Sequence, residues 1–340
     1  MSGFGPLAPA ALGSITAPAS LALGTPAAVT SGTGYLPWGN YQALPMPSLP
    51  GLAFFHGMEV GRYAMEGKSY LIGLLAPDVA TRRALIEAAL ALAHRLSSLH
   101  CLFPPGDEAL EWQAAGLMLR QGVQFHWENR GYRDFEDFLA QLSHDKRKKI
   151  RQERRRVREA GVVLHRLCGS DITPEHWRFF TRCYNLTYRA HHSTPYLNLA
   201  FFERLGATMP DNVLLILAER DGAPLAATLN IYSREALYGR YWGAIEHVPM
   251  LHFEACYYQA LEFCIERGIK VFEGGAQGEH KLARGFLPTK TWSAHWLQHP
   301  SFANAVEDFL AREAKGINRY VDELNDHTPF KSSEGVESEK

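Results

Sequence analysis

The stretch EGGAQGEHKLARGF, residues 273–286, combines proton acceptors and cations around a pair of glycines. Its candidate catalytic residues are Glu273, Glu279, His280, Lys281 and Arg284. A carboxylate or an imidazole can take a proton from an amine as the amine attacks an acyl carbonyl. A lysine or an arginine can stabilise the negative charge that then develops on the carbonyl oxygen or the leaving group. The stretch therefore has the residue types that N-acyl transfer needs, although Gly274 and Gly275 fit a tight turn without a ligand equally well.

A second group of candidates centres on LYGRYWGAIEHVPMLHFEA, residues 237–255. The residues expected to bind substrate, here and in the first stretch, are Arg240, Tyr241, Trp242, His252, Glu254, Gln277 and Phe286. Neighbouring side chains of a strand point to opposite faces, so we expect one of Tyr241 and Trp242 in the core and the other in a groove. For His252 two interpretations stay open, a buried histidine at a helix start and a contact to substrate.

A run of basic residues lies near the middle of the chain. Nine lysines and arginines lie within residues 146–158, in a chain whose formal charge is only -1. We expect one helix over residues 135–160, with a narrow apolar stripe and basic side chains on its other faces. The candidate anion-binding residues are Lys146, Arg147, Lys149, Arg151, Arg154 and Arg155. Arginine suits phosphate because of its planar fork. The alternative is a solvated face on which Glu153 bridges to nearby arginines of the helix.

Composition excludes several classes of protein. The 35 basic and 36 acidic residues nearly cancel, so any anionic partner must be recognised by a local patch. Five cysteines without C-x-x-C spacing predict neither disulfides nor a zinc site, and they fit a reducing cytoplasm. The histidines lack the spacing of a metal site, so we expect no metal. Hydrolase, ATPase and dinucleotide-binding motifs are not found in the sequence.

The order of the helices and strands that we expect around these residues predicts an α+β fold. In the first half we expect strands at 69–77, 99–104 and 117–131, and helices at 106–116 and at 77–98, the latter capped by Asp78. In the second half we expect a strand at 162–167 and helices at 173–192 and 198–209, the first opened by Thr173 and Pro174. A meander at 212–220, 224–233 and 236–245 precedes a helix at 252–268 and a strand at 270–276.

The N-terminal stretch has a different composition. Residues 1–58 contain no Asp, Glu, Lys or Arg, and small residues and proline dominate them. We expect residues 1–66 to be poorly ordered, because such a composition buries too little apolar surface to offset its ordering entropy. The stretch lacks the basic start of a signal peptide, and its apolar runs are shorter than the roughly 18 residues of a membrane span.

Four stretches resemble the FemAB-like branch of the GNAT N-acyltransferase superfamily: LRQGVQFHWENRGY, DKRKKIRQERRRVREAGV, LYGRYWGAIEHVPMLHFEACYYQALEFCIERG and FEGGAQGEHKLARGFLPTKTWSAHW. The resemblance extends from about residue 67 to Phe330. It implies tandem GNAT-like domains: a partial first domain at 67–133, a basic connecting helix at 134–161 and a second, acyltransferase domain at 162–330. Residues 1–66 and a disordered tail at 331–340 would flank them.

The resemblance also implies an N-acyltransferase, of the EC 2.3 class, that moves an acyl or aminoacyl group to an amine acceptor in cell-wall or related metabolism. The donor would be acyl-coenzyme A or aminoacyl-tRNA, with no covalently bound cofactor. The other partners would be a small-molecule or cell-wall-type amine, and not DNA. Lys281, Arg284 and Phe286 match the family's K-F-K/R-x-x-F pattern beside the site of transfer. The basic helix would face an anionic substrate or donor.

The chain departs from the GNAT pattern at EHVPMLHFEA, which lacks the glycines that hold the pyrophosphate of coenzyme A. Two alternatives stay open. One is a non-catalytic binding protein that uses the basic helix for RNA, lipid phosphate or a cell-wall precursor, and the other is an inactive relic. An enzyme would lose turnover but keep its fold when Lys281 or Arg284 becomes alanine, whereas a binder would lose affinity on charge reversal in the basic run.

Overall fold

The computed structural model describes residues 34–36, 39–41, 52–59, 68–74, 76, 78–94, 96–275 and 278–331. For the strands before residue 75 it describes the backbone alone. Most of residues 1–66, the tail after Lys331 and the candidate Gln277 lie outside the described residues, so the expectations for them stay predictions.

The chain divides into two compact units. The first comprises Met1–Gly122 and Lys290–Arg319, and the second comprises Val123–Thr289 and Tyr320–Lys340. Three elements contribute residues to both units: strands β6 (Met118–Glu128) and β12 (Leu287–Leu297) and helix α10 (Pro300–Asn325). All the candidate site residues belong to the second unit. The domain limits expected at residues 133 and 161 stay a prediction.

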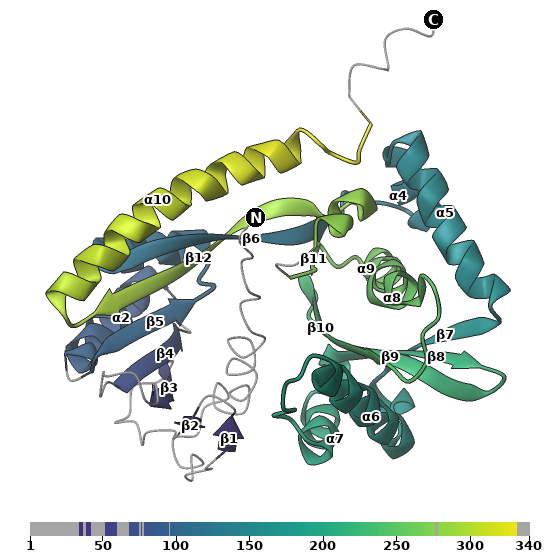
Figure 1. Ribbon diagram of the computed structural model, residues 1–340, viewed down its shortest axis with the longest axis horizontal. Helices are drawn as coiled ribbons and strands as arrows, with labels where there is room; N and C mark the ends of the chain where they lie inside the picture. The colour runs from purple at the N-terminus through teal and green to yellow at the C-terminus, as the bar shows by residue number, and fades with distance from the viewer. Residues whose placement is uncertain are drawn as a thin grey trace, which may run out of the picture. The chain divides into compact units, whose positions relative to one another are not determined.

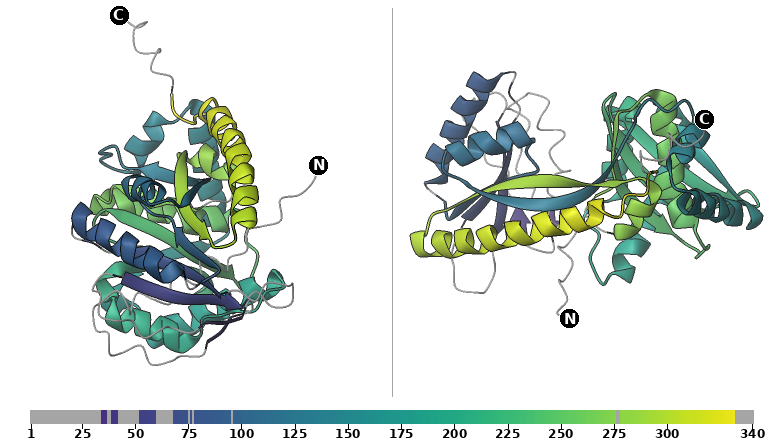
Figure 2. Two further views of the ribbon diagram at one scale, coloured as in Figure 1. Left: turned by 90° about the vertical axis from the view of Figure 1, so that its left-hand side faces the viewer. Right: turned by 90° about the horizontal axis from the view of Figure 1, so that it is seen from above.

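In the first unit a hydrophobic core lies on one face of a sheet. The strand order is β3–β4–β5–β12, and β1 and β2 form a separate antiparallel pair. The elements are β1 (Gly34–Leu36), β2 (Gly39–Tyr41), β3 (Leu52–Glu59), β4 (Lys68–Leu74), α2 (Val79–Ala93), β5 (Ser98–Leu102) and α3 (Gly106–Ala114). Leu99, Trp112 and Ala294 are buried together in this core with α2. Figure 2 shows α2 on one side of β12 and α10 on the other.

The face of this sheet opposite the core carries a pair of histidines. His100 of β5 and His295 of β12 are register partners, and their Nδ1 atoms lie 2.8 Å apart. Their outer nitrogens hydrogen-bond Ser98 at 2.9 Å and Ser293 at 2.8 Å. Burial lowers the pKa of His100 to about 4 and, with the neighbouring His100, that of His295 to about 3. Both imidazoles are therefore neutral at neutral pH.

The second unit places helices on both faces of a sheet with strand order β6–β11–β10–β9–β8–β7. Its other strands are β7 (Val162–Cys168), β8 (Val213–Arg220), β9 (Ala223–Tyr232), β10 (Ala236–Ala244) and β11 (Val271–Glu273). Its α-helices are α4 (Phe135–Gln141), α5 (His144–Glu159), α6 (Pro174–Ala190), α7 (Leu199–Thr208), α8 (Leu251–Phe253) and α9 (Gln259–Arg267). Short helical segments are η2 (Gly169–Asp171), η3 (Pro210–Asn212), the π-helix η4 (Glu254–Tyr258) and η5 (Glu279–Arg284).

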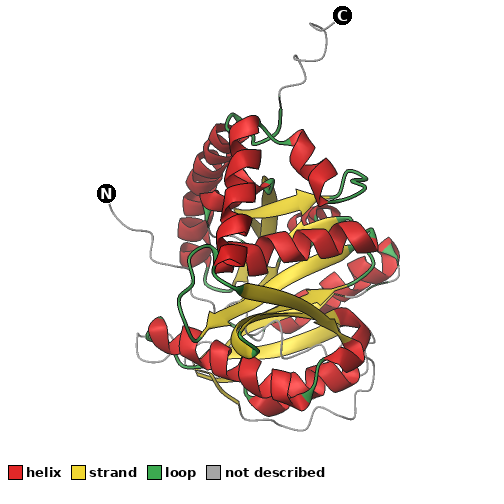
Figure 3. Ribbon diagram, turned by 90° about the vertical axis from the view of Figure 1, so that its right-hand side faces the viewer, coloured by secondary structure: helices red, strands yellow, loops and turns green. Residues whose placement is uncertain are grey.

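Separate cores lie on the two faces of the strands of this unit. Helices α6 and α7 pack on one face through Trp177, Phe180 and Phe202. Helix α5 packs on the other face, together with η4 and α9, through Ile150 and Val157. Figure 1 shows α6 and α7 on one side of β8 and β9 and α8 and α9 on the other, and Figure 3 shows the strands between layers of helices.

Local sequence signals account for the predicted helix starts. Asp78 accepts a hydrogen bond from the backbone of Thr81 at the start of α2. Thr173 and His176 form a capping box at the start of α6, with Pro174 at its first position. Such caps satisfy backbone N–H groups that the first helical turn leaves unpaired. The predicted starts of α2 and α6 are thus confirmed.

The prediction of a single helix over residues 135–160 is wrong, because the helix is interrupted between α4 and α5. Leu142 is extended there and forms a β-bridge with Phe330. The backbone N–H of Ser143 donates to the oxygen of Pro329 at 2.9 Å. A strand-like partner almost 190 residues away in sequence thus interrupts a segment whose local pattern favours a helix.

Among the described residues, none of the helices combines the length and the apolar character needed to cross a membrane.

Candidate functional site

The candidate site lies where two parallel strands separate. Strands β10 and β11 pair at three positions, of which the last joins Tyr238 to Glu273. Beyond Glu273 the chain stays hydrogen-bonded to β6, because Gly274 N donates to Phe125 O at 2.9 Å and Phe125 N donates to Gly275 O at 3.1 Å. Strand β10 instead continues to Ala244, with an irregularity between Gly239 and Tyr241. The separation places the Glu273 side chain at the point where the sheet opens.

Glu273 is a half-buried carboxylate with an imidazole and a guanidinium nearby. Burial raises the pKa of Glu273, and the charge of Arg240 lowers it in part. His126, its register partner on β6, has Nε2 4.0 Å from the Glu273 carboxylate, which is beyond hydrogen-bond distance. Burial and the charge of Lys281 lower the pKa of His126 to about 4, so this imidazole is neutral at neutral pH.

Lys281 is a buried cation in η5, eight residues after Glu273. Its side chain is 5% exposed, and its ammonium group donates to the carbonyl oxygen of Gly275 at 3.2 Å. Burial lowers the pKa of Lys281 to about 8. The group is therefore mostly charged at neutral pH and can lose its proton just above it. A lysine of this kind can serve either as an electrostatic stabiliser or as a proton donor.

The two glycines of the stretch serve the local packing. A Cβ atom on Gly274 would lie 3.1 Å from both the Phe125 oxygen and the Phe286 ring. Gly275 has φ +80°, a left-handed conformation that favours glycine. The glycine pair is therefore explained by the turn itself, without a ligand.

Arg284 lies in a buried network. Its guanidinium pairs with Glu153 of α5 at 2.8 Å, donates to Tyr258 Oη at 2.9 Å and donates to the His280 oxygen at 2.6 Å. It also stacks 3.5 Å from the centre of the Phe253 ring. Glu153 pairs with Arg284 rather than with arginines of its own helix, so the expected bridge along α5 is not formed.

Glu279 and His280 lie at the surface. Glu279 accepts a hydrogen bond from Tyr320 Oη at 3.1 Å, so it is not the ion partner of Arg284. The Nε2 atom of His280 lies 3.1 Å from Tyr257 Oη, and burial together with nearby cations lowers the pKa of this imidazole. The three candidate proton acceptors thus occupy different environments, and Glu273 alone among them sits at the strand separation.

The expected groove residues divide between the two faces of the sheet. Tyr241 lies on the face of α6, where its hydroxyl is 2.7 Å from that of Tyr196. Trp242 lies on the other face, in edge contact with His252 at 5.4 Å between ring centres. Burial, with nearby positive charge, lowers the pKa of His252 to about 4. The prediction that Tyr241 and Trp242 point to opposite faces is confirmed.

The remaining substrate-binding candidates have structural partners. Arg240 lies over the Tyr241 ring at 5.9 Å. Glu254, in the π-helix, is buried and pairs with Arg154 at 3.0 Å. Phe286 is fully buried and packs on Tyr257 with 5.5 Å between ring centres. Only Arg240 of these three lies near Glu273.

The basic helix α5 uses some of its charges internally. Arg154 pairs with both Glu254 and Glu262, the latter at 2.7 Å. The other arginine candidates have nearby partners: Arg147 donates to the Ala140 oxygen at 3.5 Å, Arg151 pairs with Glu136, and Arg155 pairs with Glu159 at 3.5 Å. Lys146 and Lys149 form no ion pair within the described part of the chain.

Sequence reasoning did not single out His126 or Tyr258 for the site. His126 alternates with the apolar Phe125 and Trp127 along β6, so its face can be read from the sequence. Its closeness to Glu273 depends on the pairing of β6 with β11 and has no local signal. No group of three or more His, Cys, Asp or Glu in the described ranges could hold a metal ion.

The chain belongs to the FemAB-like family, described as peptidoglycan biosynthesis/recognition, whose profile matches residues 65–332. The family prediction is confirmed, and so is the α+β fold related to the FemX type. A comparison with curated proteins found no match.

Three solved structures are similar in fold. The C-terminal domain of a candidate lysylphosphatidylglycerol synthetase from Agrobacterium fabrum has a TM-score of 0.54 at 12% identity, covering 77% of this chain and 85% of that one. L-PGS from Bacillus licheniformis has a TM-score of 0.53 at 10% identity, covering 77% and 86%. FemX has a TM-score of 0.51 at 12% identity, covering 75% and 90%. At these identities the likeness concerns the fold.

Proposed function

We propose that the protein is an N-acyltransferase that moves an acyl or aminoacyl group to an amine, with Glu273 as the general base. The observation that carries this proposal is the position of Glu273 where β10 and β11 separate. Beyond Gly239, β10 has no strand partner on that side within the described residues. Backbone N–H groups at such an edge can hold the carbonyl oxygen of an acyl donor.

The chemistry follows from the charge states of the neighbouring groups. The amine attacks the acyl carbon, a C–N bond forms, and Glu273 accepts the amine proton directly or through one water. The C–O bond of an aminoacyl ester, or the C–S bond of a thioester, then breaks, and the leaving oxygen or sulfur takes up a proton. Its raised pKa makes the Glu273 carboxylate a better base than an exposed carboxylate.

Lys281 supports this step as a cation. Its protonated form stabilises negative charge on the carbonyl oxygen or the leaving group. Arg284 acts as a positioning residue, because its buried contacts tie η5 to α5 and hold the segment that carries Lys281.

The donor we favour is an aminoacyl ester rather than a thioester of coenzyme A. The loop between β10 and α8, residues 245–250, contains no glycine, and Met250 takes a left-handed conformation with φ 68°. It therefore lacks the glycine amides that bind the pyrophosphate of coenzyme A. The family description supports an amine of a cell-wall precursor as acceptor. Five free cysteines support a cytoplasmic location.

The test is transfer of labelled acyl groups by the purified full chain, using alanyl-tRNA, lysyl-tRNA and acetyl-coenzyme A as donors and a lysine-containing cell-wall precursor as acceptor. Glu273→Gln should lower the rate about 100-fold or more, because general base catalysis contributes about that much. Glu279→Gln, a matched change at the surface, should leave the rate unchanged. Wild-type rates in Glu273→Gln would refute the assignment of the base.

The second candidate is a binding protein that uses α5. The exposed Lys149 and the partly exposed Lys146, without ion partners in the described ranges, favour it. Under this alternative no donor is consumed, and charge reversal at these two lysines removes binding of the cell-wall precursor.

A further inference from the structure

The outer face of α6 carries a basic stripe that the proposed reaction does not use. Arg178, Arg182, Asn185 and Arg189 follow each other at spacings of four, three and four residues. With 3.6 residues per turn, these spacings place all four on one side of the helix. The stripe spans about 16 Å at a rise of 1.5 Å per residue.

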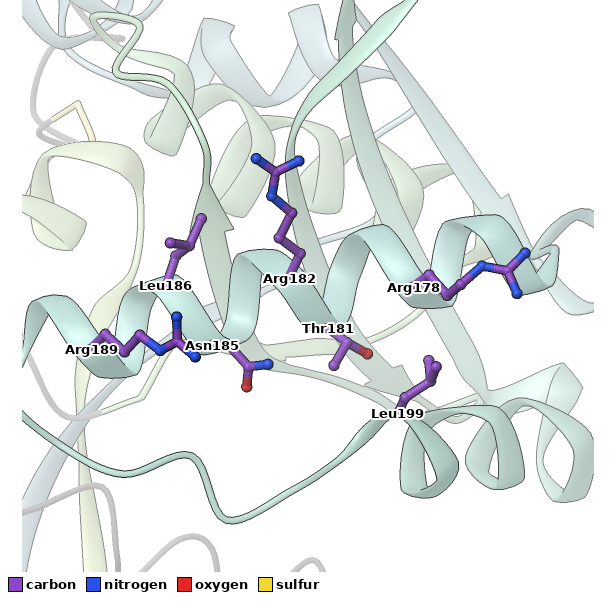
Figure 4. A pocket seen from close by; sticks show the side chains of 7 residues that line it. All are labelled: Arg178, Thr181, Arg182, Asn185, Leu186, Arg189 and Leu199. Carbon is purple, nitrogen blue, oxygen red and sulfur yellow. The ribbon is translucent and has the colours of Figure 1, made fainter.

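These side chains line a depression with a volume of about 390 Å³. Its remaining walls are Thr181, Leu186 and Leu199, of which Leu199 comes from the start of α7. Figure 4 shows the three arginines distributed along α6, with Leu199 facing the helix from α7. A volume of this size suits a small molecule or a lipid headgroup rather than a nucleic-acid duplex.

The charge in this depression is not neutralised locally. Arg178 pairs with Glu175 near the helix start, whereas Arg182 and Arg189 form no ion pair within the described residues. No Asp or Glu occurs between Glu175 and Glu203 in the sequence. Arg178 and Arg182, four residues apart, repel each other slightly, and an anion bound across them would remove this repulsion.

The residue types indicate the kind of anion. Every cation between Glu175 and Glu203 is an arginine or a histidine, and none is a lysine. The planar guanidinium binds phosphate oxygens in pairs, which an ammonium group does not. Leu186 and Leu199 add an apolar wall beside the cations. The site therefore fits a phosphate or diphosphate group joined to an apolar part.

We propose that the α6 depression, lined by Arg178, Arg182, Asn185 and Arg189, binds such an organic phosphate. The ligand is either a soluble molecule or the headgroup of an anionic lipid in a bilayer. Both share the same chemistry at the arginines, and they differ in whether a membrane surface is needed.

The experiment measures binding by the full chain in three arms. Calorimetric titration with pyrophosphate and with a short-chain, monomeric phosphatidylglycerol tests the soluble source. Co-sedimentation with phosphatidylglycerol vesicles, against phosphatidylcholine vesicles, tests the bilayer source. We expect saturable binding in at least one arm that weakens as salt is raised, since exposed charges are screened.

The variant Arg182→Gln/Arg189→Gln should weaken that binding by about tenfold or more for each guanidinium removed. The matched control, Arg312→Gln/Lys315→Gln on exposed positions of α10, removes the same charge and should bind as the parent does. Thermal unfolding of both variants checks that the fold is kept.

Two results would overturn the proposal: no saturable binding in any arm, and unchanged affinity in the α6 variant of a folded protein. The binding test does not depend on acyl transfer. A negative binding result therefore leaves the assignment of Glu273 as the general base intact, and a failure of that assignment leaves the binding proposal intact.

Discussion

The proposed reaction needs Glu273 deprotonated and Lys281 protonated. These two requirements set the pH dependence that we predict for acyl transfer. Glu273 acts as a carboxylate, so activity rises with pH through its raised pKa. Lys281 acts when protonated, so activity falls about tenfold per pH unit above its pKa of about 8. The measurement is the rate between pH 5 and pH 10. In Lys281→Met the fall above pH 8 should disappear, and a flat profile from pH 7 to pH 9.5 in the parent would contradict the role of Lys281.

Glu153 and Arg284 form a buried ion pair. We therefore predict that substituting one of them lowers the stability of the fold, and not only the rate of acyl transfer. Both side chains are almost fully buried, at 5% and 3% exposed. Removing one partner of such a pair costs about 3–5 kcal/mol, because the other charge remains buried without its counter-charge. We therefore expect Arg284→Met to lower the urea midpoint strongly, with much of the loss recovered in Glu153→Leu/Arg284→Met.

The exposed pair of Arg133 and Asp137 is the control for this measurement, and Arg133→Ala should change the midpoint little. A folded Arg284→Met with an unchanged midpoint would contradict the structural role. The same burial means that Arg284→Ala does not separate an enzyme from a binder, because it acts on the fold in either case.

The candidate residues could be named from the sequence, but their partners could not. Glu273 and Lys281 stand out because charged groups flank a pair of glycines at the end of a strand. The partner of Arg284 lies 131 residues earlier in the chain, and that of Arg154 lies 100 residues later. Such pairs depend on how α5 packs against η4 and η5, for which neither spacing nor periodicity carries a signal.

At the scale of elements, α6 lies unusually close to β10. A Cβ atom on Gly243 would be 2.3 Å from the backbone oxygen of Cys183. We therefore predict that Gly243→Ala pushes α6 away from the sheet and lowers the free energy of unfolding by about 1–3 kcal/mol or more. Thermal unfolding measures this change.

Gly316 of α10 offers the matched control, since a Cβ atom there would meet no atom within 4 Å. Gly316→Ala should raise stability by about 0.5–1 kcal/mol, as alanine favours a helix. Equal effects of the two substitutions would show that helix propensity, and not the contact with Cys183, decides the outcome at Gly243.

Elements with strong local signals were predictable and those set by distant contacts were not. The caps at Asp78 and Thr173 and the Asp221 turn mark elements that the structure contains. The break at Leu142 depends on Phe330, so the local pattern wrongly favours a continuous helix. Strand β12 and helix α10 were not predicted, and β12 takes its place through pairing with β5.

At the scale of the whole molecule, buried neutral histidines predict acid sensitivity. The pKa values of His100, His126 and His252 are lowered to about 4 and that of His295 to about 3, mainly by burial. The unfolded chain, with histidine pKa values near 6.5, then binds more protons below that pH. The stability contributed by these groups is full above pH 6.5 and is lost as pH falls towards 4.

Each histidine contributes up to about 1.4 kcal/mol per pH unit in this window. Two of the four belong to each unit, so both units should weaken together. The measurement is the urea midpoint at pH 7, 6 and 5, followed by fluorescence. A midpoint that stays constant over this range would contradict neutral, buried imidazoles in the folded protein.

The division of the first unit between the two ends of the chain has a consequence for biosynthesis. Ala294, a core residue of that unit, leaves the ribosome long after Leu99 and Trp112 do. The second unit also waits for the end of the chain, because its core includes Leu324. The part of the protein that is translated first therefore cannot close its core until Ala294 has emerged, and its apolar strand face needs shielding while the rest of the chain is being made.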